Sequence, residues 1–271
     1  MISVLMRSHN DIKYIRQTVE MLLSQELEES VEIISCDDRS TDGTAEYLAA
    51  VPQLRRIAPP DGKYVPGKTL NHMIRQAKGE IIVFNNSDAV PQSREYLKFL
   101  TLPLKDESID CVYGNQIARQ DAYRVVKKDY ERAFGDGTTA AAWGNFFSLV
   151  SSAFRKSDLL AKPFDEQIRY SEDADWVKRY SAKIAYAADA VVEHSHNYTL
   201  PEVKKRFFNE GLADKQMGKP AMSLLHCVRS VFAETMRDWI CLAKQGAFKE
   251  FFYAPVYRYV QKVSYYRGTQ Q

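Results

Sequence analysis

The sequence has little or none of several features that define large classes of protein. Its 271 residues include four cysteines, which lie far apart and form no Cys-x-x-Cys pair, so neither a zinc ribbon nor a redox pair is supported. No stretch approaches the roughly twenty apolar residues of a membrane span, and the chain starts in a predicted strand without a signal peptide. We find no internal repeat, no low-complexity tract and no Walker-type phosphate loop. These absences predict a cytoplasmic globular protein with reduced thiols.

Charge is unevenly distributed along the chain. The net charge of +2 combines 12 Lys and Arg against 6 Asp and Glu from residue 198 onward with 25 against 29 in the preceding part. The tail therefore carries a net +6 and the remainder a net −4. With 45% hydrophobic residues, a chain of this length can bury a full core without being divided into many small domains. We expect a domain boundary near residue 197.

The first half of the chain alternates between strand and helix patterns. Short apolar runs at residues 2–6, 31–36 and 80–84 indicate buried strands. Apolar residues at helical spacing predict helices over residues 12–24 and 68–78. Strands that alternate with helices of this length indicate βαβ units, so we predict an α/β fold with a mostly parallel central sheet flanked by helices.

Each of these strands ends in a polar cluster, at residues 7–11, 37–44 and 85–88. The carboxyl ends of parallel strands share one edge of a sheet, so we expect the clusters to line the crevice where open α/β sheets bind ligands. The acids, Ser, Thr and Gly of residues 37–44 are also typical of loops and helix caps, and the polar run before Pro91 is also typical of a turn. Taken singly, each cluster fits a binding role and a purely structural role.

Taken together, the clusters resemble the motifs of family 2 glycosyltransferases in order and spacing, from about residue 2 to residue 196. The resemblance rests on residues 4–10, 37–44 and 71–80, on Asn86-Ser87-Asp88 in the place of an Asp-x-Asp motif, and on Ser171-Glu172-Asp173 in the place of a late Glu-Asp motif. It implies a GT-A type fold for nucleotide-diphospho-sugar transfer. Residues 7–10 and 193–196 are most similar to the rhamnosyltransferase-like subgroup.

The resemblance implies an inverting glycosyltransferase that moves a sugar from a UDP- or dTDP-sugar to a glycan or lipid-linked acceptor in bacterial surface polysaccharide synthesis. Residues 1–197 would form the catalytic domain, with a nucleotide-sugar half at about 1–90 and an acceptor half at about 91–197, and residues 198–271 a helical extension. A degenerate sugar-nucleotide-binding or assembly subunit is one alternative, favoured by Asn86 in place of an acid. A nucleotidyltransferase is another, although the Gly-rich phosphate loop typical of that class is missing. We expect no nucleic-acid partner.

The resemblance also assigns a donor site. Asp38 would accept a hydrogen bond from the imide of a uracil or thymine base, with Asp37 and Asp42 as alternatives that could instead cap a helix. Arg7 stands where the family usually has proline and would bring a cation near the diphosphate, and Lys68 at a helix start suits a phosphate. The nucleotide-sugar-binding candidates are Arg7, Ser8, Asn10, Asp38, Lys68, Asn71, Asn86, Ser87 and Asp88.

The expected cofactor is a divalent metal, Mg²⁺ or Mn²⁺, because the departing diphosphate needs a hard cation held by carboxylate and phosphate oxygens. Asp88 is the best single ligand. His194 and His196 follow an apolar run at residues 185–192 that indicates a strand. Alternate residues of a strand share a side, so either imidazole could contact metal or diphosphate. A structural His pair is the alternative, and two His residues do not by themselves define a zinc site.

Inverting transfer needs a general base, and the resemblance selects Asp173 over Glu172 and Asp175. Ser171 is the expected cap of a helix over residues 172–180, whose dipole would depress the pKa values of the acids in its first turn. Such acids also favour a helix start without any catalysis, whereas a partly dry pocket would raise one pKa towards that of a base. The acceptor-side candidates are Trp143, Gly144, Asn145, Glu172 and Trp176.

The tail has a helical pattern over residues 224–240 and an aromatic, basic segment after Gly246. Basic amphipathic segments with aromatic faces lie in membrane interfaces, so peripheral contact with the inner face of the cell membrane is one expectation. Packing on a second subunit, which would give a homodimer, is the other.

Overall fold

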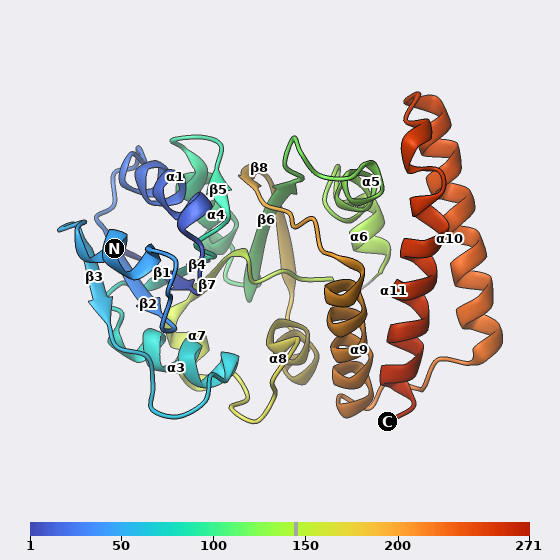
Figure 1. Ribbon diagram of the computed structural model, residues 1–271. Coiled ribbons are helices and arrows are strands. Elements are labelled where there is room, and N and C mark those ends of the chain that lie inside the picture. Colours follow the sequence, from blue (N-terminus) through green and yellow to red (C-terminus); the bar gives the residue numbers. More distant parts are fainter. Residues whose placement is uncertain (144–145) are drawn as a thin grey trace. The chain divides into compact units, whose positions relative to one another are not determined.

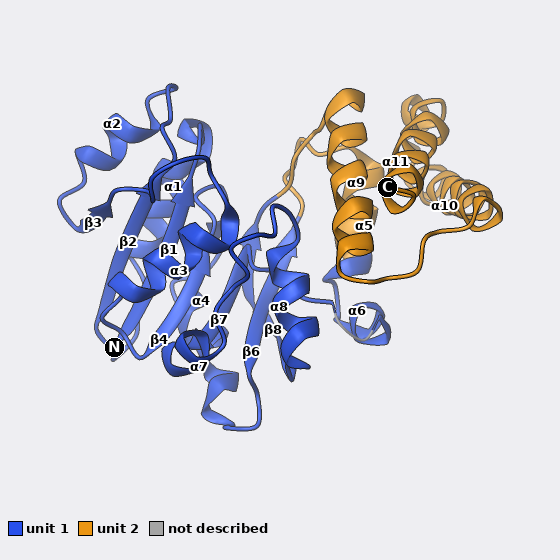
Figure 2. Cartoon of the chain, turned by 90° about the horizontal axis from the view of Figure 1, so that it is seen from below, with its two compact units in different colours: residues 1–117, 132–194 blue, residues 118–131, 195–271 orange. Residues whose placement is uncertain are grey.

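The structure, a computed structural model of the chain, describes residues 1–143 and 146–271 (Figure 1). The chain forms two compact units (Figure 2). Unit 1 comprises residues 1–117 and 132–194, and unit 2 comprises residues 118–131 and 195–271. Unit 2 therefore includes a segment from the middle of the sequence as well as the tail. A catalytic domain over residues 1–197 stays a prediction, because compact units are not by themselves units of function.

Unit 1 contains the sheet. Its strands are β1 (Ile2–Ser8), β2 (Val31–Asp37), β3 (Leu54–Ile57), β4 (Ile81–Asn85), β5 (Val90–Pro91), β6 (Cys111–Ile117), β7 (Ser151–Arg155) and β8 (Ile184–Glu193). Its helices are α1 (Ile12–Leu23), α2 (Thr44–Ala49), α3 (Pro66–Gln76), α4 (Tyr96–Thr101), η1 (Leu102–Lys105), α6 (Thr138–Ala142), α7 (Lys156–Ala161) and α8 (Glu172–Tyr180).

The strands of unit 1 form one sheet in the order β3-β2-β1-β4-β7-β6-β8-β5. Parallel pairs join β1 to β2 and β4, β2 to β3, and β6 to β8. β7 runs antiparallel to both β4 and β6, and β5 runs antiparallel to β8. The predicted α/β fold with a central sheet is confirmed. The sheet is mixed, because β7 lies between β4 and β6 and runs opposite to both, and β5 runs opposite to β8.

Both faces of the sheet are buried, as expected for strands covered by helices on each side. On one face, Val4 of β1 and Val83 of β4 join a core cluster with Ile15 of α1. On the other, Phe154 of β7 contacts Trp176 of α8 edge to face, with 5.1 Å between ring centroids. Successive strand residues point to opposite faces. Because both faces are covered, these strands lack a polar side.

The strand register brings the predicted polar clusters together. Ser8 at the end of β1 lies opposite Asp37 at the end of β2. On the other side of β1, Leu5 pairs with Phe84 of β4, so the residues after β4 lie level with Arg7. The Ser87 N–H donates to the Arg7 carbonyl at 3.4 Å. The clusters at residues 7–11, 37–44 and 85–88 therefore share one edge of the sheet.

Unit 2 is helical. Its helices are α5 (Arg124–Ala133, all but the last two residues in this unit), α9 (Leu200–Gln216), α10 (Leu224–Lys244), η2 (Phe248–Glu250) and α11 (Tyr253–Thr269). Thr199 and Glu202 form a capping box at the start of α9. α9 and α11 cross at Gly211 and Gly268, where a Cβ on either glycine would collide with a carbonyl oxygen of the other helix.

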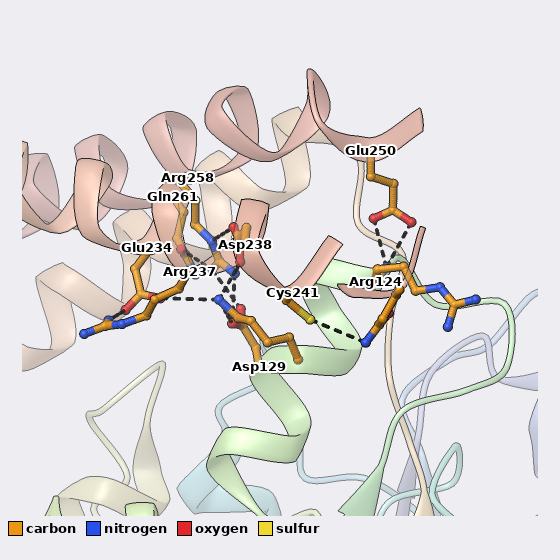
Figure 3. Close-up of polar contacts among 11 residues, drawn as sticks. Arg124, Asp129, Glu234, Arg237, Asp238, Cys241, Glu250, Arg258 and Gln261 are labelled. Carbon is orange, nitrogen blue, oxygen red and sulfur yellow. Dashed lines mark hydrogen bonds and ion pairs between the residues drawn. The ribbon is translucent and has the colours of Figure 1, made fainter. Parts of the chain in front are cut away.

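A buried ion cluster ties α5, α10 and α11 together (Figure 3). Arg258 of α11 donates to Asp238 of α10 at 2.6 Å and to Asp129 of α5 at 2.8 Å. Lys128 of α5 also donates to Asp238 and lies 3.5 Å from Glu234. Arg258 and Asp238 are fully buried. Pairing on several sides is what makes such buried charges tolerable.

Among the helices of the described residues, none is both long and apolar enough to cross a membrane. The cysteines are all free thiols, and only Cys241 is not fully buried.

Candidate active site

The loops after β1 and β2 are joined by hydrogen bonds into one surface. The Asp38 N–H donates to the Ser8 carbonyl at 2.9 Å, and the Thr41 N–H donates to the Asn10 side chain at 2.8 Å. Asn10 has a left-handed backbone, with φ of 59°, a conformation that asparagine tolerates better than most residues. Asn10 and the buried Ser8, both predicted donor contacts, therefore shape this surface.

The three acids after β2 have different surroundings. Asp37 accepts hydrogen bonds from the hydroxyls of Ser8 at 2.8 Å and Ser40 at 2.6 Å. Asp42 accepts from the N–H groups of Ile12 and Thr44, both at 3.0 Å, at the starts of α1 and α2. The carboxylates of Asp37 and Asp42 are thus engaged in hydrogen bonds within the protein.

The third acid, Asp38, has a different contact. Its carboxylate lies 3.7 Å from Arg39 and is 24% exposed. Of the three candidates for a base contact, the geometry therefore favours Asp38.

Arg7 connects the donor edge to the late Glu-Asp motif. Its guanidinium donates to the Tyr64 hydroxyl at 2.9 Å and to Glu172 at 3.1 Å. Its side chain is 18% exposed and that of Glu172 13%, so this ion pair is only partly screened by solvent. Arg7, the cation predicted beside the diphosphate, is thus held between the Glu172 carboxylate and the Tyr64 hydroxyl, at the sheet edge where the polar clusters meet.

The turn after β4 is fixed by backbone and side-chain contacts. The Asn86 N–H donates to the Val150 carbonyl at 2.9 Å. The buried Ser87 hydroxyl donates to Asp11, a residue that the sequence did not single out. Asp88 is 6% exposed, much less than expected for a turn aspartate, and that burial is the first sign of a specific site.

Asp88 lies beside His194. The distance from Asp88 Oδ2 to His194 Nε2 is 3.4 Å, and both residues are buried. The other ring nitrogen, Nδ1, lies 3.1 Å from Gln116 Oε1, while the Gln116 amide donates to the Ser148 hydroxyl at 2.7 Å. An amide that donates to Ser148 presents its oxygen to the ring, so Gln116 Oε1 is placed to accept from Nδ1, and Nε2 is the ring nitrogen that faces Asp88.

This donor set fits a divalent cation. A carboxylate oxygen and an imidazole nitrogen are ligands for Mn²⁺ and related ions. Metal-binding His residues regularly donate their second N–H to an amide or carboxyl oxygen, and Gln116 Oε1 lies 3.1 Å from His194 Nδ1 in the position of such an acceptor. Asp88 and His194 could therefore hold the expected metal. Gln116 and Ser148 were not predicted, because neither a polar residue inside a strand, as Gln116 in β6, nor a serine in the loop before β7 carries a local signal of such a role.

His196 belongs to unit 2, where its ring stacks on Tyr198 with 5.0 Å between centroids. β8 ends at Glu193, so the two His residues follow the strand and do not alternate along it. Strand alternation therefore does not explain how the two rings point. A metal contact of His196 remains a prediction.

Asp173 has the surroundings of a general base. Its carboxylate accepts hydrogen bonds from the N–H groups of Ala174 at 2.8 Å and Leu149 at 3.3 Å. Burial, and next the charge of Glu172, raise the pKa of Asp173 to about 6. The expected depression by the helix dipole is wrong for this residue, because desolvation outweighs it. A carboxyl with a pKa near neutrality suits proton transfer at physiological pH.

The neighbouring acids are engaged elsewhere. Glu172 pairs with Arg7, and Asp175 accepts from Arg179 at 2.7 Å one turn along α8. α8 begins after Ser171, as predicted, but the Ser171 side chain makes no capping hydrogen bond. Its backbone is left-handed, with φ of 61°, which turns the chain into the helix.

The acceptor-side candidates differ in accessibility. Trp143 is 47% exposed, and its ring lies 5.6 Å from the Arg132 guanidinium, so a sugar could reach it. Trp176 is 1% exposed and packs against Phe154. The structure gives Trp176 a packing role, because an indole without exposed surface cannot stack on an acceptor. Gly144 and Asn145 lie outside the described residues.

Two further donor-site candidates occupy α3. Lys68 donates to the Asp61 carbonyl at 2.9 Å and is only partly exposed. Asn71 is buried, and its amide donates to the Phe164 carbonyl and accepts from the Phe164 N–H, at 2.9 and 3.0 Å. Asn71 thereby anchors the segment before α8. A direct contact of either residue with a donor remains a prediction.

Comparison with solved structures shows the same fold. A mannosyltransferase from Pyrobaculum calidifontis in complex with GDP-Man and Mn²⁺ aligns with 99% of this chain and 86% of its own, at a TM-score of 0.67 and 15% identity. Glucosyl-3-phosphoglycerate synthase from Mycobacterium tuberculosis, with Mn²⁺, UDP and glucosyl-3-phosphoglycerate, aligns over 81% of each chain at a TM-score of 0.58 and 21% identity. This confirms the GT-A type fold.

Sequence comparison shows the family. The O-antigen chain rhamnosyltransferase WbaN of Salmonella anatum is 26% identical over 195 residues, or 67% of this chain and 62% of that protein. A GalNAc(5)-diNAcBac-PP-undecaprenol beta-1,3-glucosyltransferase of Campylobacter jejuni is also 26% identical, over 68% of this chain and 61% of its own. The chain thus spans just over three fifths of the length of these relatives. The glycosyl transferase family 2 model matches residues 3–160, more than half of the chain, and the chain therefore belongs to glycosyl transferase family 2.

Proposed function

We propose that this protein is an inverting glycosyltransferase that uses a UDP- or dTDP-sugar with a divalent metal, Mg²⁺ or Mn²⁺. The observation that carries the proposal is the pair Asp88 and His194, 3.4 Å apart and buried, at the same sheet edge as Arg7 and Asp38. Family membership supports it, as do the nucleotide and Mn²⁺ bound in the two solved structures of the same fold.

In the proposed reaction, Asp173 takes the proton of the acceptor hydroxyl as the acceptor oxygen bonds to the anomeric carbon. The bond from that carbon to the diphosphate oxygen breaks, and the nucleoside diphosphate leaves with the electron pair. Asp38 binds the base, and Arg7 lies beside the diphosphate. A divalent cation bound at Asp88 and His194 would neutralise charge on the leaving group.

The proposed donor is a deoxyhexose such as rhamnose, because the Salmonella relative is named a rhamnosyltransferase. The proposed acceptor is a glycan or lipid-linked glycan of a bacterial surface polysaccharide, since one relative is named for the O-antigen chain and the other for an undecaprenol-linked glycan. Such an acceptor would place the enzyme at the inner face of the cell membrane.

A binding subunit without activity is the second candidate, because Asn86 replaces an acid of the family motif. Thermal stabilisation by a panel of nucleotide sugars, with and without Mn²⁺, separates the donors. Asp88→Asn should abolish the metal-dependent part of the stabilisation, whereas Glu107→Gln, an exposed acid change, should leave it intact. Donor binding without sugar release or transfer to any acceptor would support the binding subunit, and the absence of donor binding would contradict both.

A further inference from the structure

The outer surface of α10 is unusually apolar. Leu224, Val228 and Phe232 follow one another at intervals of four residues and are 63%, 58% and 68% exposed. Residues spaced by four lie on one face of a helix. Phe248 and Phe252, between α10 and α11, are also exposed, Phe252 at 88%. An apolar surface of this extent marks a place where the protein meets an apolar partner.

A groove accompanies this face. It has a volume of about 670 Å³ and lies between α10 and α11. Its lining includes Val228, Phe232, Met236, Pro255, Tyr259 and Val263. Tyr259 is 58% exposed, and Tyr266 and Arg267 also border the groove. Aromatic side chains with one polar end are common where apolar and aqueous phases meet.

The charges around this face have one sign. Residues 223–271 contain the acids Glu234, Asp238 and Glu250, and none of them is exposed. Asp238 pairs with Lys128 and Arg258, while Glu234 accepts from Arg237 at 2.6 Å and lies 3.5 Å from Lys128 (Figure 3). Glu250 accepts from the Arg124 N–H at 2.9 Å.

The exposed charged residues of the same segment are all basic. They are Arg229, Arg237, Lys244, Lys249 and Arg267. The cluster thus removes Glu234 and Asp238 from the surface, and the exposed charges of this segment are cations beside exposed apolar side chains.

We infer that the apolar face of α10, with the groove it forms against α11, docks onto an anionic lipid bilayer. An amphipathic helix of this kind lies in the plane of the interface with its apolar side in the acyl region and its cations at the headgroups. A second copy of the chain fits less well, because a symmetric contact would bring the same cations together. The inference concerns a surface outside the donor site and does not depend on sugar transfer.

The test uses the full chain and vesicles of phosphatidylcholine, either alone or with about one third phosphatidylglycerol. The wild-type protein should float with the anionic vesicles and much less with the neutral ones, and its binding should weaken as salt rises. Phe232→Glu should lower partitioning by about tenfold or more, because it places a charge on the docking face. Leu160→Glu, at a residue of α7 that is 52% exposed, is the matched control and should change partitioning less than twofold.

Wild-type protein that stays unbound with anionic vesicles would overturn the inference, as would Phe232→Glu that partitions like wild type. A wild-type dimer in light scattering that becomes a monomer in Phe232→Glu without vesicles would also overturn it and assign the face to a second subunit. Thermal stabilisation by nucleotide sugar should be the same in wild type and Phe232→Glu. The two proposals can therefore fail separately.

Discussion

Replacing Asp173 by asparagine should make the protein less active and more stable. Burial raises the pKa of Asp173 from 3.8 to about 6, so the folded state favours the protonated carboxyl. The stability that this group contributes is fully present below pH 3.8 and is lost as pH rises through about 6. One pKa unit corresponds to about 1.4 kcal/mol, so the ionised carboxylate destabilises the fold by about 3 kcal/mol at pH 8.

An asparagine side chain at this position cannot ionise, and its oxygen can still accept from the Ala174 N–H as that of Asp173 does at 2.8 Å. We expect Asp173→Asn to raise the free energy of unfolding by up to about 3 kcal/mol at pH 8 and by about half as much at pH 5. Urea denaturation at both pH values measures the difference. Turnover should fall by about 10² or more while nucleotide-sugar affinity stays nearly unchanged.

Asp175→Asn is the control, because Asp175 is paired with Arg179 at 2.7 Å. Loss of this pair should destabilise the protein by about 1 kcal/mol at pH 8, the opposite sign from Asp173→Asn. If Asp173→Asn is no more stable than wild type at pH 8, then the ionised Asp173 carboxylate does not lower the free energy of unfolding. That result would refute the argument for its raised pKa. Turnover near the wild-type level would move the base to Glu172 or Asp175.

Three further changes test other parts of the structure. Glu172→Gln removes a negative charge beside Asp173 and should move the acidic limb of the kcat/KM profile to lower pH, whereas Arg7→Gln exposes that charge and should move it to higher pH; identical profiles would contradict the coupling. Gln116→Leu removes the acceptor of the His194 N–H and should weaken Mn²⁺ binding by about 10- to 100-fold in calorimetry with UDP, with the exposed Gln120→Leu as control. Arg258→Met leaves Asp238 buried with fewer partners and should lower the free energy of unfolding in urea by about 3–5 kcal/mol, so a loss under about 1 kcal/mol would show that the cluster adapts.

Local patterns predicted most of the sheet edge correctly. The helix expected over residues 12–24 is α1, Ile12–Leu23, and the strand expected over residues 31–36 is β2, Val31–Asp37. These elements follow from side-chain periodicity, which depends only on neighbours in the chain. Parallel pairing then places the ends of β1, β2 and β4 together, so the positions of Ser8, Asp38 and Asp88 could be anticipated.

Non-local features could not be anticipated. One such feature is the position of β7, which lies between β4 and β6 and runs antiparallel to both. Neither the length nor the composition of a strand determines which strands it pairs with. The pKa of Asp173 depends on burial, which is set by residues far from it in sequence, whereas the helix start that would lower it is local. The family resemblance therefore selected the residue, whereas the local argument from the helix dipole gave the wrong direction for its pKa.

Contacts that the local sequence does not reveal also separate the carboxylates with structural roles from those proposed to bind ligands. Asp37 and Asp42 are nearly indistinguishable from Asp38 in the sequence, but each accepts hydrogen bonds from the fold, and that use fixes the loops on which Asp38 is presented. Asp88 is buried and Asp173 is partly buried within unit 1, although removing a carboxylate from solvent in general destabilises a protein. A fold that keeps such groups loses stability at those positions, and the catalytic and metal-binding roles proposed here supply a physical reason for retaining them.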